Sequence, residues 1–257
     1  MKNLKLNQKR YKGFTLVELL VVVVIIAVLM GMLIPAVMRA KVRARVATAR
    51  ADMSNIKGAI LSYQTDYSRF PVPRPLLALA PMPNWALQDD PAPGNGGGDM
   101  TFGAGSTPNY GIMRILCSVD DSTPYGTTLT VNGNHSRNPK KNKYLDVPSG
   151  DDVGDSGLDP IYNFNDPFGQ QYIITMDMDG DGDCSDRYYR ETGMNADVFI
   201  GLRKSKWTPP TPPGGAIQDE HVLMGSVMIY SRGPDRKATS MVSALEGVNA
   251  DNILDWK

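Results

Sequence analysis

A run of aspartates is the part of this sequence best suited to binding a metal ion. Five carboxylates lie within ten residues, mostly at alternate positions with glycines between them, and they are Asp177, Asp179, Asp181, Asp183 and Asp186. Calcium takes six to eight oxygen ligands, and a Dx[DN]x[DN]G loop supplies several of them from one short segment. An EF-hand is not predicted, because Tyr188 stands where its bidentate glutamate would be and no helix pattern precedes the run. The pattern predicts either a calcium site completed by Glu191 or a remote group, or a solvated acidic turn.

Enzymatic chemistry finds little support in the sequence. The two histidines, His135 and His221, have no metal-ligating partner at a recognisable spacing. No GxSxG, HExxH or Walker motif is present. With 27 basic and 27 acidic residues the net charge is zero, so no overall field attracts nucleic acid. We therefore expect a protein that is not an enzyme and has no nucleic-acid partner.

The first 38 residues combine a basic head with a long apolar run. Five basic residues and no acid precede Gly13, and between Phe14 and Met38 the only charged side chain is Glu18. A helix of these 25 residues would be about 37 Å long, enough to cross a hydrocarbon core of about 30 Å. The positive-inside rule places the basic head in the cytoplasm and the residues after Met38 outside.

The candidate processing signal lies before the apolar run, whereas an ordinary signal peptide is cut after it. Gly13-Phe14-Thr15-Leu16-Val17-Glu18-Leu19-Leu20 resembles the prepilin leader of type IV pilins and type II secretion pseudopilins, and Pro35 falls where that family carries a helix-kinking proline. The resemblance implies that a membrane-embedded prepilin peptidase cuts between Gly13 and Phe14 and methylates Phe14. It also implies that Glu18 pairs with the amino terminus of a neighbouring subunit during filament assembly.

The helix is expected to continue beyond the membrane. Good helix formers fill residues 39–50, and an apolar stripe at three- and four-residue spacing follows, consisting of Val42, Val46, Ala49, Met53, Ile56, Ala59, Ile60 and Tyr63. A helix from about Thr15 to Asp66, kinked near Pro35, would end before Pro71. Candidate strands are Thr127–Val131, Gln171–Met178, Ala196–Leu202 and His221–Ser231. The predicted fold class is α+β, with the long helix packed on a small antiparallel β-sheet that carries long loops.

The C-terminal part carries a second, weaker resemblance. Asn165-Asp166-Pro167-Phe168-Gly169-Gln170-Gln171-Tyr172 is similar to the Asp-Pro-Trp-Gly-x-x-Tyr segment of major pseudopilins, with Phe168 in place of tryptophan. Tyr230-Ser231-Arg232-Gly233-Pro234-Asp235, followed by Asp251-Asn252-Ile253, is similar to their closing strand and loop. In that family the loop binds calcium, which makes Asp235 and Asp251 the alternative calcium ligands here. Lys237 stands where glycine is usual, and the loop is longer and less acidic than in the family.

The sequence leaves the state of the two cysteines open. Cys117 and Cys184 both lie in the part predicted to be exported, where a disulfide could form, and two separate buried thiols are the alternative.

Together these features predict three segments: a leader at residues 1–13, a membrane or filament-core segment at 14–38, and a periplasmic or extracellular pilin-like domain at 39–257. The function predicted is that of a structural subunit of a type II secretion pseudopilus in the bacterial inner membrane. Its expected partners are further copies, other pseudopilins, the prepilin peptidase, the inner-membrane assembly platform and membrane lipid. A type IV pilus subunit and an anchored calcium-binding protein that does not polymerise are the alternatives.

Processing gives the first testable prediction. Gly13 has no side chain, so a peptidase can approach the backbone closely beside the basic head. We expect Gly13→Val to leave the precursor uncut in the membrane, while mass spectrometry of the natural protein finds N-methylated Phe14 as its first residue. A mature protein that begins at Met1, or that is cut beyond Met38, would contradict the assignment.

Overall fold

The computed structural model describes residues 15–73, 99–104, 107–120, 131–186, 188–189, 201–207, 218–239 and 246–256. The chain divides into two compact units, one ending at Ala44 and one beginning at Arg45. The elements are α1 (Leu16–Tyr67), β1 (Met100–Phe102), α3 (Tyr110–Leu116), the 3₁₀ turn η2 (Gly133–His135), β2 (Gly157–Leu158), β3 (Phe164–Asn165), β4 (Ile173–Met176), β5 (Asp183–Cys184), β6 (Arg203–Trp207), β7 (Gln218–Met224), β8 (Val227–Ser231), the 3₁₀ turn η4 (Gly247–Asn249) and β9 (Ile253–Leu254).

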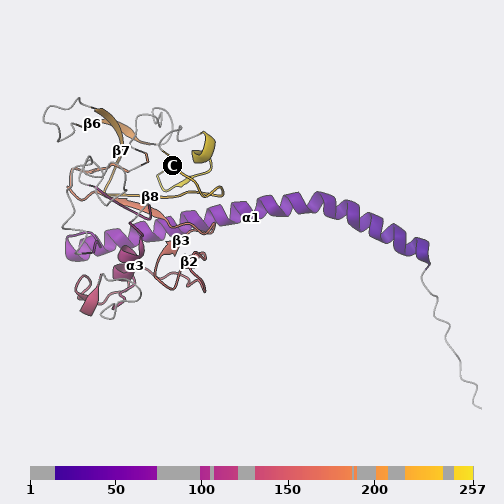
Figure 1. Cartoon of the computed structure of the whole chain (residues 1–257), viewed down its shortest axis with the longest axis horizontal. Coiled ribbons are helices and arrows are strands. Elements are labelled where there is room, and N and C mark those ends of the chain that lie inside the picture. The colour runs from indigo at the N-terminus through magenta and orange to yellow at the C-terminus, as the bar shows by residue number, and fades with distance from the viewer. Residues whose placement is uncertain are drawn as a thin grey trace, which may run out of the picture. The chain divides into compact units, whose positions relative to one another are not determined.

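Helix α1 is the long helix that the sequence predicts, and it continues through Pro35 (Figure 1). Within the described residues it is the one helix long and apolar enough, by length and composition, to cross a membrane. The eighteen large apolar side chains between Leu16 and Met38 are 45% to 87% exposed. No other described part of the chain covers them, so this segment requires a surrounding other than water.

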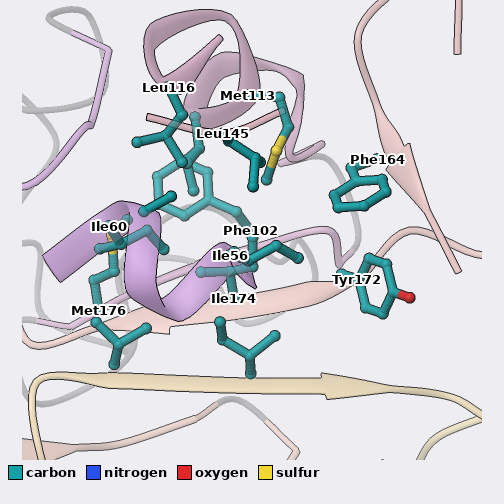
Figure 2. Packing of buried hydrophobic residues seen from close by; sticks show 14 of the residues in the cluster. Ile56, Ile60, Phe102, Met113, Leu116, Leu145, Phe164, Tyr172, Ile174 and Met176 are labelled. Atoms are coloured by element: carbon teal, nitrogen blue, oxygen red, sulfur yellow. The ribbon is translucent and has the colours of Figure 1, made fainter. Parts of the chain in front are cut away.

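The second part of α1 buries the predicted apolar stripe. Ala49, Met53, Ile56, Ala59, Ile60 and Tyr63 are all buried, whereas Val46 is half-buried and Val42 is exposed. Ile56 and Ile60 lie among Met113 and Leu116 of α3, Phe102 of β1 and Ile174 of β4 (Figure 2). The three- and four-residue spacing places these side chains on one helix face, which the rest of the domain covers.

A four-stranded antiparallel sheet in the order β1-β4-β8-β9 packs against this helix face. In the central pair Ile174 lies opposite Ile229, and Ile173 lies opposite Tyr230. Successive side chains of a strand point to opposite faces. Ile174 and Ile229 therefore join the core that contains α1, while Ile173 and Tyr230 join a second apolar cluster with Leu254. The sheet is buried on both faces, and the α+β prediction is confirmed.

Two smaller sheets, β2-β3 and β5-β7-β6, complete the described domain. The predicted strand at Gln171–Met178 is present as β4, shortened at both ends. The single strand predicted at His221–Ser231 is wrong, because Gly225 at φ 141° separates β7 from β8 and the two strands belong to different sheets. The predictions at Thr127–Val131 and Ala196–Leu202 fall largely outside the described residues.

An ion pair connects the segment that follows β9 to α1. Lys57 Nζ lies 2.6 Å from Asp255 Oδ2, and the Asp255 side chain is only 4% exposed. Asp255 Oδ1 accepts a hydrogen bond from the Ile229 amide at 3.0 Å. One carboxylate thus joins the helix, β8 and the end of the chain.

The packing of α1 predicts that alanine substitutions at two adjacent positions lower the free energy of unfolding by very different amounts. Ile60 is fully buried, while Leu61 is 38% exposed. In a truncated protein beginning at Arg39, Ile60→Ala should lower the free energy of unfolding by about 2–4 kcal/mol through lost apolar burial and the cavity it leaves. Leu61→Ala is the matched control and should lower it by less than about 1 kcal/mol, since its side chain already meets solvent. Equal losses in urea unfolding would contradict the packing described.

Candidate functional site

Glu18 sits in the first turn of α1 and is bonded to the residue that caps the helix. Its Oε2 accepts hydrogen bonds from the Thr15 amide and the Thr15 hydroxyl, both at 2.8 Å. The Thr15 Oγ1 in turn accepts a hydrogen bond from the Glu18 amide at 3.2 Å. This reciprocal arrangement is a capping box, which satisfies backbone donors that the first helical turn leaves open. Thr15 and Glu18 are therefore a structural pair as well as part of the leader motif.

The capping box leaves one oxygen of Glu18 available. Among the described residues, Oε1 accepts no hydrogen bond, whereas Oε2 accepts two. Gly13 and Phe14, the predicted processing residues, lie outside the described residues. The geometry therefore presents a carboxylate oxygen at the start of α1 that can accept a further donor.

Asp166 lies at the centre of a second group of polar contacts. These contacts join segments 165–172 and 230–235, which the sequence analysis compared with major pseudopilins. This buried carboxylate accepts hydrogen bonds from the Phe168 amide at 2.8 Å, the Gln170 amide at 3.0 Å and the Ser231 hydroxyl at 2.5 Å. Burial raises the pKa of Asp166, and these hydrogen bonds, that of Ser231 first, oppose the rise. The turn after β3 is thereby fixed to the end of β8.

The same turn is also attached to α1. The Tyr172 hydroxyl donates a hydrogen bond to Asp52 Oδ2 at 2.8 Å. Burial raises the pKa of Asp52, and the Tyr172 hydrogen bond opposes it. Segments that are distant in the sequence, carrying Asp52, Asp166 and Ser231, thus meet around one aromatic turn. We assign this centre a structural role, because its donors and acceptors are satisfied by one another.

The five aspartates of the acidic run do not form one group. Asp183 is paired with the guanidinium of Arg203. Asp186 is fully buried and accepts hydrogen bonds from the Tyr189 amide at 3.1 Å and the Thr175 hydroxyl at 3.0 Å. Asp181 accepts a hydrogen bond from the Asp183 amide at 2.8 Å, within the turn. These three carboxylates stabilise the turn and its neighbouring strands through bonds to other residues of the chain.

Asp177 and Asp179 instead meet Asp99, a residue that the sequence analysis did not select. Oxygen atoms of the three carboxylates all lie within 4.8 Å of one another. Met100 pairs with Met176 between β1 and β4, so the antiparallel register continues from Asp99 to Asp177. Strand pairing alone brings Asp99 to the acidic run, and no local sequence signal marks it.

The surroundings of this cluster, Asp99, Asp177 and Asp179, suit a hard cation. Asp99 is 2% exposed and Asp177 is 5% exposed. Burial, followed by repulsion from Asp179 and Asp177, raises the pKa of Asp99 to about 8. Backbone amides of Gly180 and Gly182 hold the two Asp177 oxygens, at 2.6 Å and 3.0 Å. Carboxylate oxygens are the donors that calcium prefers, so the residues present fit that ion.

The alternative pair, Asp235 and Asp251, also lies close together. The Asp235 amide donates a hydrogen bond to Asp251 Oδ2 at 2.9 Å. Within the described residues, Asp251 Oδ1 is buried and has no hydrogen-bond partner. Gly233 permits this approach, because at φ 67° a β-carbon there would lie 2.1 Å from the Asp251 carbonyl oxygen. The loop therefore brings together the two residues named in the sequence analysis.

Both cysteines are free thiols. Cys184 is buried in β5 and Cys117 is half-buried after α3. Burial raises the pKa of Cys117 to about 11, so the thiol is protonated at neutral pH.

Comparison with known families identifies the N-terminal segment. The prokaryotic N-terminal methylation motif matches residues 8–34. No significant match was found among curated proteins or solved structures. The motif implies processing by a prepilin peptidase and assembly into pilin-type filaments, and with the apolar half of α1 it fits a membrane-anchored, single-pass protein. The chain carries the prepilin leader signature of the type IV pilins and pseudopilins.

Proposed function

We propose that this chain is a structural, non-enzymatic subunit of a type II secretion pseudopilus. The observation that carries the proposal is the division of α1 into an exposed apolar half and a half buried in a sheet domain. The first half would lie in the inner membrane before assembly and in the filament core afterwards. The sheet domain would lie in the periplasm and on the outside of the filament.

The apolar half supports assembly on energetic grounds. Covering one large apolar side chain is worth about 1.5–3 kcal/mol. Eighteen such side chains are exposed between Leu16 and Met38, so leaving them in water would cost on the order of tens of kcal/mol. Lipid covers them before assembly, and the helices of other subunits would cover them in a filament.

A secretion role is favoured over a type IV pilus by the centre at Asp166. The two segments that are similar to those of major pseudopilins meet there through the Asp166–Ser231 hydrogen bond. Deletion of the gene distinguishes the roles. Loss of exported enzymes from the medium, with surface filaments and motility intact, supports the pseudopilus. Loss of surface filaments with normal secretion supports the pilus instead.

Glu18 provides a direct test of assembly. In an apolar filament core an unpaired carboxylate is costly, and the amino group of a neighbour's Phe14 would donate to the open Glu18 oxygen. We expect Glu18→Ala to be processed and inserted normally, with filament yield at least about tenfold lower, as for loss of a charge-assisted hydrogen bond. Val17→Ala changes the same helical turn without removing a charge and should assemble normally. Sheared filaments are counted by electron microscopy, and equal yields from the two variants would show that Glu18 is dispensable.

We also propose that the cluster of Asp99, Asp177 and Asp179 binds calcium. Three clustered carboxylates, none of which forms an ion pair with a described basic residue, favour a divalent cation there. The ion would offset the repulsion between them and hold the start of β1 against the end of β4. Asp235 and Asp251 remain the alternative pair of ligands.

Thermal unfolding of the protein beginning at Arg39, with calcium and with chelator, tests this proposal. At a free calcium concentration one hundred times the dissociation constant, binding should stabilise the domain by about 2.7 kcal/mol. Asp179→Asn should abolish the shift, since it removes a ligand charge at an exposed position while keeping the side-chain shape. Asp235→Asn is the matched control and should retain it. No shift in the unmodified protein would reject both sites, and loss only in Asp235→Asn would move the site to the C-terminal loop.

A further inference from the structure

Three basic residues directly after the apolar half of α1 have no partner in the described chain. Arg39, Lys41 and Arg43, here called the basic segment, are all exposed, and none makes an ion pair, hydrogen bond or ring contact with a described residue. Arg45, two residues further on, differs, because its guanidinium lies 6.0 Å from the ring centroid of Phe168. The basic segment is therefore an unsatisfied positive surface.

An unsatisfied negative surface lies in the loop before β2. Asp151, Asp152 and Asp155, here called the acidic loop, are exposed, and none forms an ion pair within the described residues. The loop has a defined shape, because Asp155 Oδ2 accepts a hydrogen bond from the Asp152 amide at 3.0 Å. Its base is closed by the hydrogen bond from the Gly150 amide to the Leu158 carbonyl at 2.8 Å. The negative charges are thus held together on one projecting turn.

Some other exposed charges of the described domain do find partners within the chain. Lys140 lies 3.1 Å from Asp66, and Lys143 lies 2.5 Å from Asp146. The basic segment and the acidic loop carry opposite charges, three on each. Each also presents an exposed valine, Val42 at 41% and Val153 at 66%. The two surfaces are complementary in both charge and apolar character.

We propose that the acidic loop of one copy docks on the basic segment of a second copy of this chain. This proposal rests on the proposed function, since it describes a contact within the filament. The two surfaces differ, so the contact is head-to-tail, and a docked pair keeps one free acidic loop and one free basic segment for further copies. Such heterologous contacts that do not close into a ring generate open helical assemblies.

The same contact explains what replaces lipid when a subunit leaves the membrane. The basic segment begins one residue after Met38, at the end of the apolar run, where long lysine and arginine side chains reach the phosphates of the lipid headgroups. Extraction removes those headgroups and leaves the positive charges without counter-charges. The acidic loop of a neighbouring copy supplies them in the filament, while anionic lipid repels that loop before assembly.

Charge reversal in the full-length protein tests the contact, in cells that assemble the unmodified filament. Asp151→Lys/Asp152→Lys reverses two side chains that accept no hydrogen bond from a described residue, and Arg39→Glu/Arg43→Glu reverses two residues one helical turn apart. Because like charges would then face each other, each double variant should lower filament yield at least about tenfold. The variant that combines all four changes restores opposite charges and should recover yield to within about threefold of the unmodified protein.

Two controls separate the contact from folding, processing and net charge. Asp146→Lys/Glu246→Lys changes the net charge as the loop variant does, at other exposed positions, and should assemble normally. The mass of the mature protein in membranes shows whether each variant is inserted and processed. Loss of yield with normal processing in each double variant, and recovery in the combined variant, supports the proposal.

Three results would overturn it. Full yield from the loop variant would show that the acidic loop makes no assembly contact. Loss of yield in the helix variant without recovery in the combined variant would indicate that the basic segment serves lipid or another protein. Equal loss in the control variant would indicate a general charge effect. Failure of the unmodified chain to form filaments in those cells would instead refute the proposed function.

Discussion

The structure depends on one constraint, which is that a single helix must serve two different surroundings. Between Leu16 and Met38 the side chains of α1 other than Glu18 are apolar on every side, and no described residue covers the large ones. From Ala49 to Tyr63 only one face is apolar, and the sheet domain covers it. A helix that is apolar all round requires lipid or other helices, whereas a one-sided helix requires a single packed partner. The change from one pattern to the other marks where the chain leaves the apolar phase.

The sheet domain is built to hold the second half of this helix. Strands β4 and β8 are buried on both faces, so the sheet lies between α1 and the C-terminal cluster around Tyr230. Lys57–Asp255 and Tyr172–Asp52 add polar contacts between the helix and distant parts of the chain. These contacts fix the position of α1 in its domain.

The sequence was most informative where the pattern is local. The bounds of α1 and its buried stripe follow from helical spacing, and Glu18 follows from a contiguous motif that the family comparison supports. Prediction was weaker where strand pairing determines the bounds of an element or the neighbours of a side chain. The segments 221–224 and 227–231 on either side of Gly225 together resemble one strand, although β7 and β8 join different sheets. Asp99 lies beside Asp177 only because β1 pairs with β4, and no pattern around Asp99 reveals that pairing. The partners of Asp183 and Asp186 are likewise set by tertiary contacts with Arg203 and Thr175.

The central claim is that the apolar half of α1 passes from lipid into a filament core. Immunogold electron microscopy of filaments sheared from cells that produce the unmodified chain and its assembly machinery tests it most directly, using an antibody against the domain that follows Arg45. The account predicts gold along the whole length of the filaments and the mature, N-methylated chain as a constituent of the sheared material. Unlabelled filaments, with all of the processed chain retained in the membrane fraction, would contradict it.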